Sequence, residues 1–174
     1  MSDGHGFQEP SPWVMRWAKD LAPGTDVLDV ACGGGRHTRF LAARGQHVTA
    51  VDRDPRVGEW LADVPEARIL VADLEADRWP FGDRRFGGMV VTNYLHRPLF
   101  PHLLDALAPG AMLIYETFAA GNERFGRPSN PDFLLRNGEL LEIVRGRLHV
   151  LGYEDIFSAL PQPAMVQRLC ARAR

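Results

Sequence analysis

The residues with the clearest chemical potential are three carboxylates and a glycine turn in the first half of the chain. Residues 27–35 (VLDVACGGG) have the pattern of a buried strand that enters a glycine turn, and residues 36–43 continue with helical spacing. A strand, a turn without side chains and a helix N-terminus form a cradle of nucleotide size. Asp29 stands in this strand, and Asp52 and Asp73 stand at the ends of two later apolar runs. A purely structural turn would not explain these three carboxylates, so we expect a nucleotide-type ligand.

The spacing of the glycines excludes a dinucleotide. A G-x-G-x-x-G frame that starts at Ala31 requires glycine where Arg36 stands, and a frame that starts at Gly33 requires it where Thr38 stands. A pyrophosphate also requires a bare helix N-terminus. We therefore expect a ligand that is held by small residues and carboxylates.

The elements that position these residues alternate along the chain. Runs rich in Val, Leu, Ile and Ala predict strands at residues 26–31, 47–51, 68–72, 88–92 and 111–116. Helical patterns lie at residues 11–22, 36–44, 55–63 and 98–107, and a further helix runs from Asn137, its expected N-cap, to Val144. Residues 74–86 are interrupted by Pro and Gly and predict a crossing loop. Residues 147–157 and 165–172 predict an antiparallel hairpin.

This order predicts an α/β fold with a doubly wound, mostly parallel seven-stranded sheet and an antiparallel terminal hairpin. We expect one domain over residues 1–174, with residues 1–10 as a mobile tail.

Composition narrows the classes of partner. The chain has 174 residues, 45% of them hydrophobic and 24% charged, as is usual for a soluble globular protein. The net charge of -2 argues against a nucleic-acid partner, and the basic residues are arginines except for Lys19. Without a membrane-spanning run or a signal-like N-terminus, we expect a cytoplasmic enzyme. Cys32 and Cys170 show no metal-ligand spacing, so we expect no metal and no disulfide.

Four segments together resemble the motifs of class I S-adenosylmethionine-dependent methyltransferases. They are residues 27–35, residues 48–52 (VTAVD), residues 70–74 (LVADL) and residues 90–96 (VVTNYLH). The resemblance covers nearly the whole chain and implies a Rossmann-like methyltransferase fold. It departs from the family at Ala31, where glycine is usual; we expect alanine to be tolerated because the ligand needs closeness more than a positive φ.

The resemblance implies that S-adenosylmethionine is the cofactor and S-adenosylhomocysteine its product. Asp52 would accept hydrogen bonds from both ribose hydroxyls. Asp73 would accept one from the adenine amino group, and the Leu74 amide would donate to an adenine ring nitrogen. The other expected cofactor-binding residues are Asp29, Ala31, Cys32, Gly33, Gly35, Arg53 and Asn93. Residues 11–22 are expected either to cover the cofactor, through Trp13 and Trp17, or to pack on the sheet edge.

The acceptor is expected beyond the carboxyl ends of the fourth and fifth strands. His96 and Tyr94 are the candidate catalytic residues there, although His96 is equally well explained as a helix-start residue. The candidate substrate-binding residues are Arg97, Glu116, Arg124 and Arg127, the arginines for an anionic acceptor. Glu116 acts either as a base or as an ion-pair partner of Arg97 or Arg124, and we favour the pairing.

The most similar branch of the family is the small-molecule branch that includes tellurite-resistance and thiol methyltransferases. We therefore predict in-line methyl transfer to a small-molecule acceptor, by a monomer or a homodimer. The alternative is a module or partner subunit that binds S-adenosylmethionine without catalysis.

Overall fold

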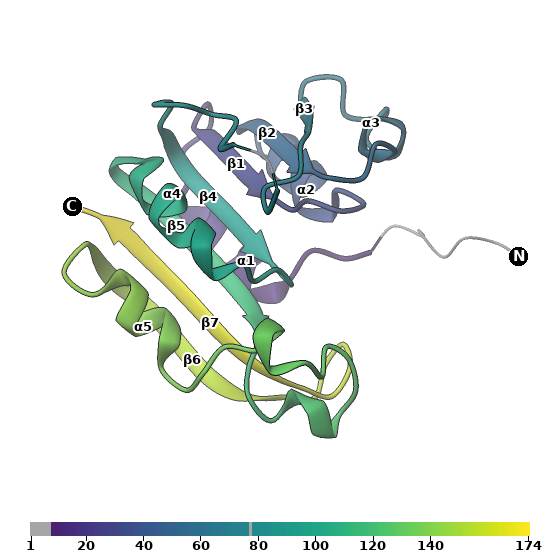
Figure 1. Ribbon diagram of the computed structural model, residues 1–174. Helices are drawn as coiled ribbons and strands as arrows, with labels where there is room; N and C mark the ends of the chain where they lie inside the picture. Colours follow the sequence, from purple (N-terminus) through teal and green to yellow (C-terminus); the bar gives the residue numbers. More distant parts are fainter. Residues whose placement is uncertain (1–7, 77) are drawn as a thin grey trace, which may run out of the picture.

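A computed structural model describes residues 8–76 and 78–174. Its centre is a seven-stranded sheet in the order β3-β2-β1-β4-β5-β7-β6 (Figure 1). The strands are β1 Asp26–Val30, β2 His47–Asp52, β3 Arg68–Val71, β4 Phe86–Thr92, β5 Leu107–Phe118, β6 Leu148–Ser158 and β7 Ala164–Ala173. Strands β1 to β5 are parallel, and β7 is antiparallel to both β5 and β6. The strand order reverses between β1 and β4, which makes this the topological switch point.

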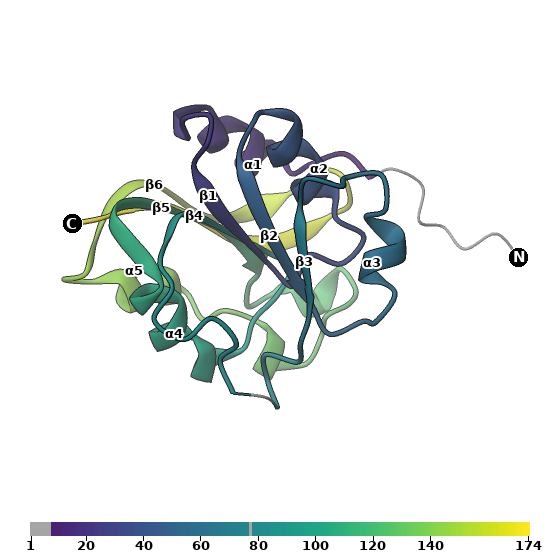
Figure 2. The same ribbon diagram turned by 90° about the horizontal axis from the view of Figure 1, so that it is seen from above.

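Helices cover both faces of the sheet (Figure 2). The α-helices are α1 Pro12–Trp17, α2 Arg36–Ala43, α3 Val57–Trp60, α4 Phe100–Asp105 and α5 Glu139–Val144. Short 3₁₀ helices follow α1 at Ala18–Asp20, precede α4 at Arg97–Leu99, and lie in the loop after β5 at Asn122–Arg124 and Pro131–Phe133. Side chains of α1, α2 and α3 pack on one face, and side chains of α4 and α5 pack on the other.

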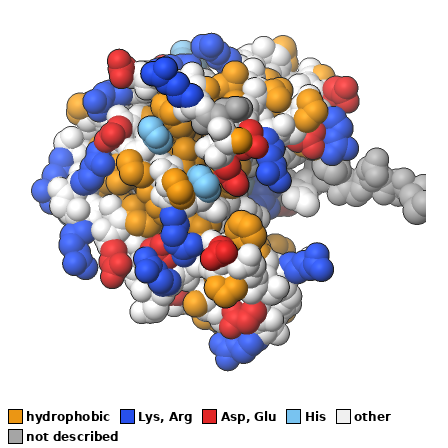
Figure 3. All heavy atoms as spheres, viewed as in Figure 1, with side chains coloured by type: hydrophobic (Ala, Val, Ile, Leu, Met, Phe, Trp, Pro, Cys, Tyr) orange, Lys and Arg blue, Asp and Glu red, His pale blue; other side chains and the backbone are white. Residues whose placement is uncertain are grey.

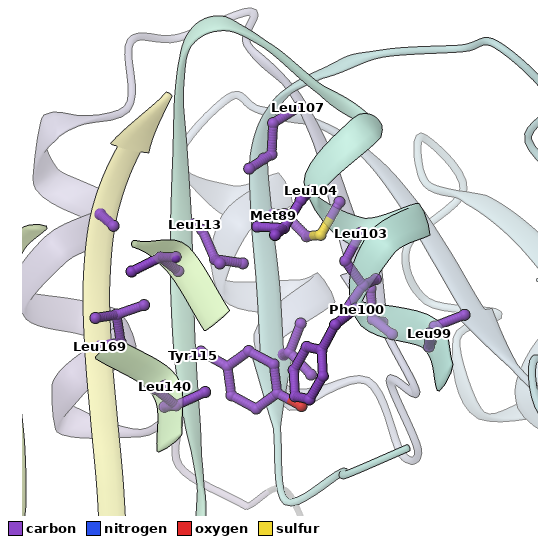
Figure 4. Close-up of a cluster of buried hydrophobic side chains, with 14 of the residues drawn as sticks. Met89, Leu99, Phe100, Leu103, Leu104, Leu107, Leu113, Tyr115, Leu140 and Leu169 are labelled. Atoms are coloured by element: carbon purple, nitrogen blue, oxygen red, sulfur yellow. The ribbon is translucent and has the colours of Figure 1, made fainter. Parts of the chain in front are cut away.

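Alternation along the strands divides the core between the two faces. Val27 and Val90 pack with α1 and α2, whereas Leu28 and Val91 lie in the larger cluster on the opposite face. In that cluster, side chains from α4, β5, α5 and β7 surround Tyr115 (Figure 4). Because the central strands are buried on both faces, their sequences are almost continuously apolar.

The predicted doubly wound sheet and its terminal hairpin are confirmed, and the differences lie at element ends. Strand β5 is longer than expected at both ends, because Leu107 pairs with Phe86 of β4 and the strand pairs with β7 as far as Phe118. Helix α3 is a single turn instead of the expected residues 55–63. Gly138, with φ 74°, is the N-cap of α5, and the side chain of Asn137 instead donates to Asp155 at 2.8 Å. Between β3 and β4 the described residues form the expected crossing loop, in which Trp79 packs on Phe81.

Helix α1 covers the sheet. Trp13 is 5% exposed, and its indole Nε1 donates to the carbonyl of Leu169 in β7 at 3.2 Å. Trp17 lies over Gly152, where a Cβ would stand 2.4 Å from the indole ring. Of the two alternatives for residues 11–22, the structure agrees with packing on the sheet edge, because both tryptophans contact the β7–β6 hairpin. Most of the expected tail, residues 1–7, lies outside the described residues. None of the helices in the described ranges is long and apolar enough to span a membrane.

Candidate functional site

Two cavities meet at the carboxyl ends of the central strands. The larger, of about 710 Å³, is lined by Gln8, Glu9, Pro10, Ala31, Cys32, Gly33, Gly34, Arg36, His37, Arg39, Phe40, Trp60, Thr92 and Asn93. The smaller, of about 260 Å³, is lined by Ala31, Val51, Asp52, Arg53, Ala72, Asp73, Leu74, Glu75, Asn93 and Tyr94. Ala31 and Asn93 line both cavities, and they directly follow β1 and β4 at the switch point. Ligands of open α/β sheets bind in this crevice.

The backbone turns sharply at these two shared residues. Ala31 has a φ of 51° and Asn93 a φ of 52°, and they are the non-glycine residues with positive φ in the described chain. A left-handed conformation costs an ordinary L-residue about 1–2 kcal/mol, although asparagine tolerates it better. We expected closeness to the ligand to matter more than a positive φ at Ala31, but the backbone there does adopt a positive φ. Such strain tends to occur where a site requires it.

The glycines of the turn serve two different purposes. A Cβ on Gly33, whose φ is 52°, would meet no described atom within 4 Å, so this position faces open space in the larger cavity. A Cβ on Gly35, whose φ is 77°, would stand 2.2 Å from the Leu61 side chain. Gly33 thus leaves room for a ligand, whereas Gly35 allows the segment after α3 to pack against the turn.

The Asp52 carboxylate joins this turn to the end of β2. One carboxylate oxygen accepts a hydrogen bond from the Gly33 amide at 2.8 Å, and the other accepts one from the Asp54 amide at 2.9 Å. Each carboxylate oxygen has a further lone pair, so Asp52 can still accept hydrogen bonds from a ligand. Asp73 lies across the same smaller cavity and accepts from the Glu75 amide at 2.9 Å.

Asp29 lies behind the cavities. Its side chain is 1% exposed, and its carboxylate accepts a hydrogen bond from the Thr38 hydroxyl at 2.6 Å. Burial raises the pKa of Asp29 to about 7, against the lowering effect of the Thr38 hydrogen bonds. Asp29 therefore ties α2 to β1. Of the residues expected to bind the cofactor, Asp29 and Gly35 line neither cavity, and the other eight do.

His37 is a site residue that the sequence reasoning missed. It is 2% exposed, lines the larger cavity, and accepts a hydrogen bond from the Ser11 amide at Nε2, at 3.0 Å. Its Nδ1 lies 3.3 Å from the Thr92 hydroxyl oxygen. Burial, and then the nearby Arg36, lower the pKa of His37 to about 3, so the ring is neutral. Its place in the first turn of the helix after the glycine turn was visible in the sequence, but its partners were not.

The two expected catalytic residues separate in space. Tyr94 lines the smaller cavity, where burial and then the neighbouring Glu75, which accepts a hydrogen bond from the phenol, raise its pKa. His96 lines neither cavity, and its carbonyl accepts from the Leu99 amide at 3.0 Å at the start of a 3₁₀ helix. This geometry agrees with His96 as a helix-start residue.

The expected substrate-binding residues have structural partners. The Arg97 guanidinium pairs with buried Glu139 of α5 at 2.7 Å and also donates to the carbonyls of Asp132 and Leu134. The hydrogen bond to Glu139 raises the pKa of Arg97. This guanidinium therefore ties the loop after β5 to α5, and binding of an anionic acceptor by Arg97, Arg124 and Arg127 remains a prediction.

Glu116 pairs with neither of the expected arginines. Its two carboxylate oxygens accept from Ser11 and from Arg168 of β7. Arg124 donates instead to the Gly121 carbonyl at 3.4 Å, and Arg127 is exposed in the loop after β5. The structure therefore does not gather these charged residues into one substrate site.

Cys32 is the cysteine that lines the larger cavity. Cys32 and Cys170 are buried free thiols. Within residues 8–76 and 78–174, no group of three or more His, Cys, Asp or Glu side chains could hold a metal ion.

Comparison with known proteins gives the family. Residues 27–110 match the model of a methyltransferase domain. A stretch of 91 residues is 35% identical to an uncharacterized methyltransferase of Synechocystis, and the match covers 52% of this chain and 42% of that protein. A stretch of 130 residues is 31% identical to a probable ribosomal RNA small subunit methyltransferase A of Pyrobaculum aerophilum, covering 71% of this chain and 56% of that protein. The chain thus spans about half the length of these relatives.

The fold is shared with solved structures. TehB from Haemophilus influenzae superposes with a TM-score of 0.78 at 20% identity, over 92% of this chain and 61% of that chain. Identity at this level shows the fold alone. Together with the matched domain model and the motifs at the two cavities, these similarities show that the chain belongs to the class I S-adenosylmethionine-dependent methyltransferases.

Proposed function

We propose that this chain transfers the methyl group of S-adenosylmethionine to a small-molecule acceptor. The observation that carries the proposal is the pair of cavities that meet at Ala31 and Asn93, with carboxylates in the smaller one. A ligand with an adenosine half and a methionine half suits two joined cavities at a switch point.

The smaller cavity suits the adenosine half. Asp52 would accept hydrogen bonds from the ribose hydroxyls, while Asp73 and the Leu74 amide would bind the adenine edge. A hydrogen bond to a charged acceptor contributes about 1.5–3 kcal/mol. Tyr94, which is neutral and half-buried in this cavity, would contact the adenosine instead of the reacting atoms. The larger cavity, where Gly33 leaves open space, would hold the methionine half and the acceptor.

When bound, S-adenosylmethionine supplies a sulfonium methyl group that an acceptor atom displaces in line. The chain's own contribution is to hold the acceptor in the larger cavity and to exclude water from it. The Nε2 lone pair of His37 is already occupied by the Ser11 amide, and Glu116 is occupied by Ser11 and Arg168. The main contribution of the chain to catalysis is therefore to position the acceptor against the methyl group. An acceptor that arrives deprotonated needs no base.

A small acceptor is supported by the size of the larger cavity and by the charge of the chain. The cavity of about 710 Å³ lies within the range of small-molecule sites. On the face shown in Figure 3, acidic and basic side chains are interspersed, and the net charge of the chain is -2. A surface for RNA would be expected to gather cations instead.

Calorimetry with S-adenosylmethionine tests the donor site. D52N keeps the size of the side chain and removes its charge, so we expect affinity to fall about tenfold to a hundredfold. D54N, in the neighbouring carboxylate that pairs with Arg56, is the control and should remain within twofold of the parent protein. Equal affinities for D52N and the parent protein would contradict the proposed ribose contacts.

Incubation of the protein with labelled S-adenosylmethionine and a cell extract tests the acceptor. We expect the label in the low-molecular-mass fraction. Label in RNA or protein alone would refute a small-molecule acceptor. Donor binding without any transferred label would favour the alternative, a non-catalytic binding module.

A further inference from the structure

One wall of the larger cavity is a short segment that precedes α1, residues 8–11, which we call the strap. Gln8, Glu9 and Pro10 line the cavity together with the glycine turn. We propose that His37 is a positioning residue that fastens the strap and thereby retains the ligand. The part of this inference that concerns ligand retention rests on the proposed function.

Ser11 anchors the strap through each of its polar groups. Its amide donates to His37 Nε2 at 3.0 Å, and its hydroxyl donates to Glu116 Oε1 at 2.8 Å. The same hydroxyl oxygen accepts from the Trp13 amide at 3.1 Å, and the carbonyl accepts from the Met15 amide at 2.9 Å. Ser11 is 4% exposed, so it is fixed at the junction of the strap, α1, α2 and β5.

His37 connects this anchor to the switch point. Because Nε2 accepts the Ser11 amide hydrogen, the ring proton must lie on Nδ1, which donates toward the Thr92 hydroxyl at 3.3 Å. The imidazole therefore bridges the strap and the end of β4, next to Asn93. The charged groups around it are Arg36 on the same helix and, beyond Ser11, the Glu116–Arg168 pair of β5 and β7. A neutral ring suits this bridge, since a protonated Nε2 could not accept the Ser11 amide hydrogen.

The rest of the strap is held weakly. Gln8 and Glu9 are exposed and Pro10 is half-buried. The Glu9 carbonyl accepts from Arg36 at 3.4 Å, at the long end of the hydrogen-bond range. The connection from Ser11 into α1 is held independently, by the hydrogen bond of the Ser11 hydroxyl to Glu116 and by the buried Trp13 of α1. Loss of the His37 contact should therefore loosen residues 8–10 while α1 stays in place.

Two substitutions of His37 separate the strap contact from the general packing of the ring. In H37Q the amide oxygen reaches about as far as Nε2 and can accept the Ser11 amide hydrogen. In H37N the amide ends near the position of Nδ1 and reaches Thr92 only. Backbone amide exchange of Ser11, measured by NMR on the full chain without ligand, should be at least tenfold faster in H37N and within twofold of the parent protein in H37Q. Unchanged Ser11 exchange in H37N would overturn the proposal.

A measurement on the unsubstituted protein covers the case in which H37N does not fold. The imidazole ¹⁵N signals of His37 should show the neutral ring with the proton on Nδ1, and this state should persist at pH 5. A proton on Nε2, in either the neutral or the charged ring, would overturn the strap contact.

Ligand binding then tests retention. We expect H37N to raise the Kd for S-adenosylhomocysteine about tenfold, as for the loss of one buried hydrogen bond, and H37Q to restore it. In a methyl-transfer assay, H37N should raise the KM for S-adenosylmethionine and leave kcat within threefold of the value for the parent protein. If Ser11 amide exchange is faster in H37N but the Kd for S-adenosylhomocysteine is unchanged, the proposal that the strap retains the ligand is refuted. If the parent protein binds no S-adenosylhomocysteine, the proposed donor site fails, but Ser11 exchange still decides the strap contact.

Discussion

Substitution of Ala31 by glycine tests whether the switch point stores backbone strain. Ala31 has a φ of 51° at the junction of the two cavities. Glycine adopts this conformation without the steric penalty of a Cβ, so A31G relieves about 1–2 kcal/mol. Two costs oppose this relief: about 0.5–1 kcal/mol from the greater backbone freedom of glycine when unfolded, and a few tenths of a kcal/mol from loss of the half-buried methyl group.

The expected net effect of A31G is a gain of about 0.5 kcal/mol in the free energy of unfolding. Ala42 provides the matched control, because it is also half-buried but lies in the last turn of α2. A42G should lose about 1 kcal/mol, since a helical alanine carries no strain to relieve. Urea denaturation of both variants therefore measures a difference of about 1.5 kcal/mol between them.

The result that would refute this reasoning is equal destabilisation of A31G and A42G. In that case Ala31 would lose the same backbone entropy as any other alanine, and its left-handed conformation would store no strain. A gain in A31G together with unchanged ligand affinity would show that the strain is not needed for binding.

Two other parts of the site give predictions of different kinds. In urea denaturation, G35A should lose at least about 2 kcal/mol, because its Cβ would overlap Leu61 and its φ is left-handed, and L61A should cost less stability in the G35A background than in the parent protein. G33A, whose Cβ meets open space but whose φ is also left-handed, should lose only the conformational cost of about 1–2 kcal/mol and should in addition weaken S-adenosylmethionine binding in calorimetry; the reverse pattern would contradict the division of roles between the two glycines. Asp29 has a folded-state pKa raised from 3.8 to about 7, so its contribution to stability is full below pH 4 and is lost as the pH rises toward 7. D29N should therefore reduce the fall in unfolding free energy between pH 4 and 7, and an unchanged pH profile would show that Asp29 is ionised in the fold.

The strands and the position of the carboxylates at the strand ends were predictable because their signals are local. Continuous apolar runs mark strands that are buried on both faces, and Asp52 and Asp73 follow two of these runs directly. The ends of parallel strands meet at one edge of a sheet, so residues that are distant in sequence were correctly expected to lie together there. The N-cap of α5 was mistaken because Asn137 is a good cap by type, but its side chain is engaged by Asp155 of β6.

The roles of the charged residues were not predictable, because their partners are distant in sequence. Arg97 pairs with Glu139, which lies 42 residues further along the chain, and Glu116 pairs with Arg168, which lies 52 residues further along. Residue type and local spacing carry no information on such pairs until the sheet order and register bring them together. Tyr94 and His96 are neighbours in sequence, yet Tyr94 lines the smaller cavity and His96 begins a 3₁₀ helix, because the chain turns at Asn93.

The sequence by itself determined the sheet, the glycine turn and the carboxylates Asp52 and Asp73 at the strand ends, since hydrophobic period and turn chemistry act over a few residues. Only the tertiary structure decided which of these residues face a cavity. It placed Asp29 under α2, turned Ala31 into the left-handed region, and joined His37 to Ser11 across 26 residues. The physical reason is that side-chain partners and backbone strain depend on how the strands and helices pack, and packing is a property of the whole chain.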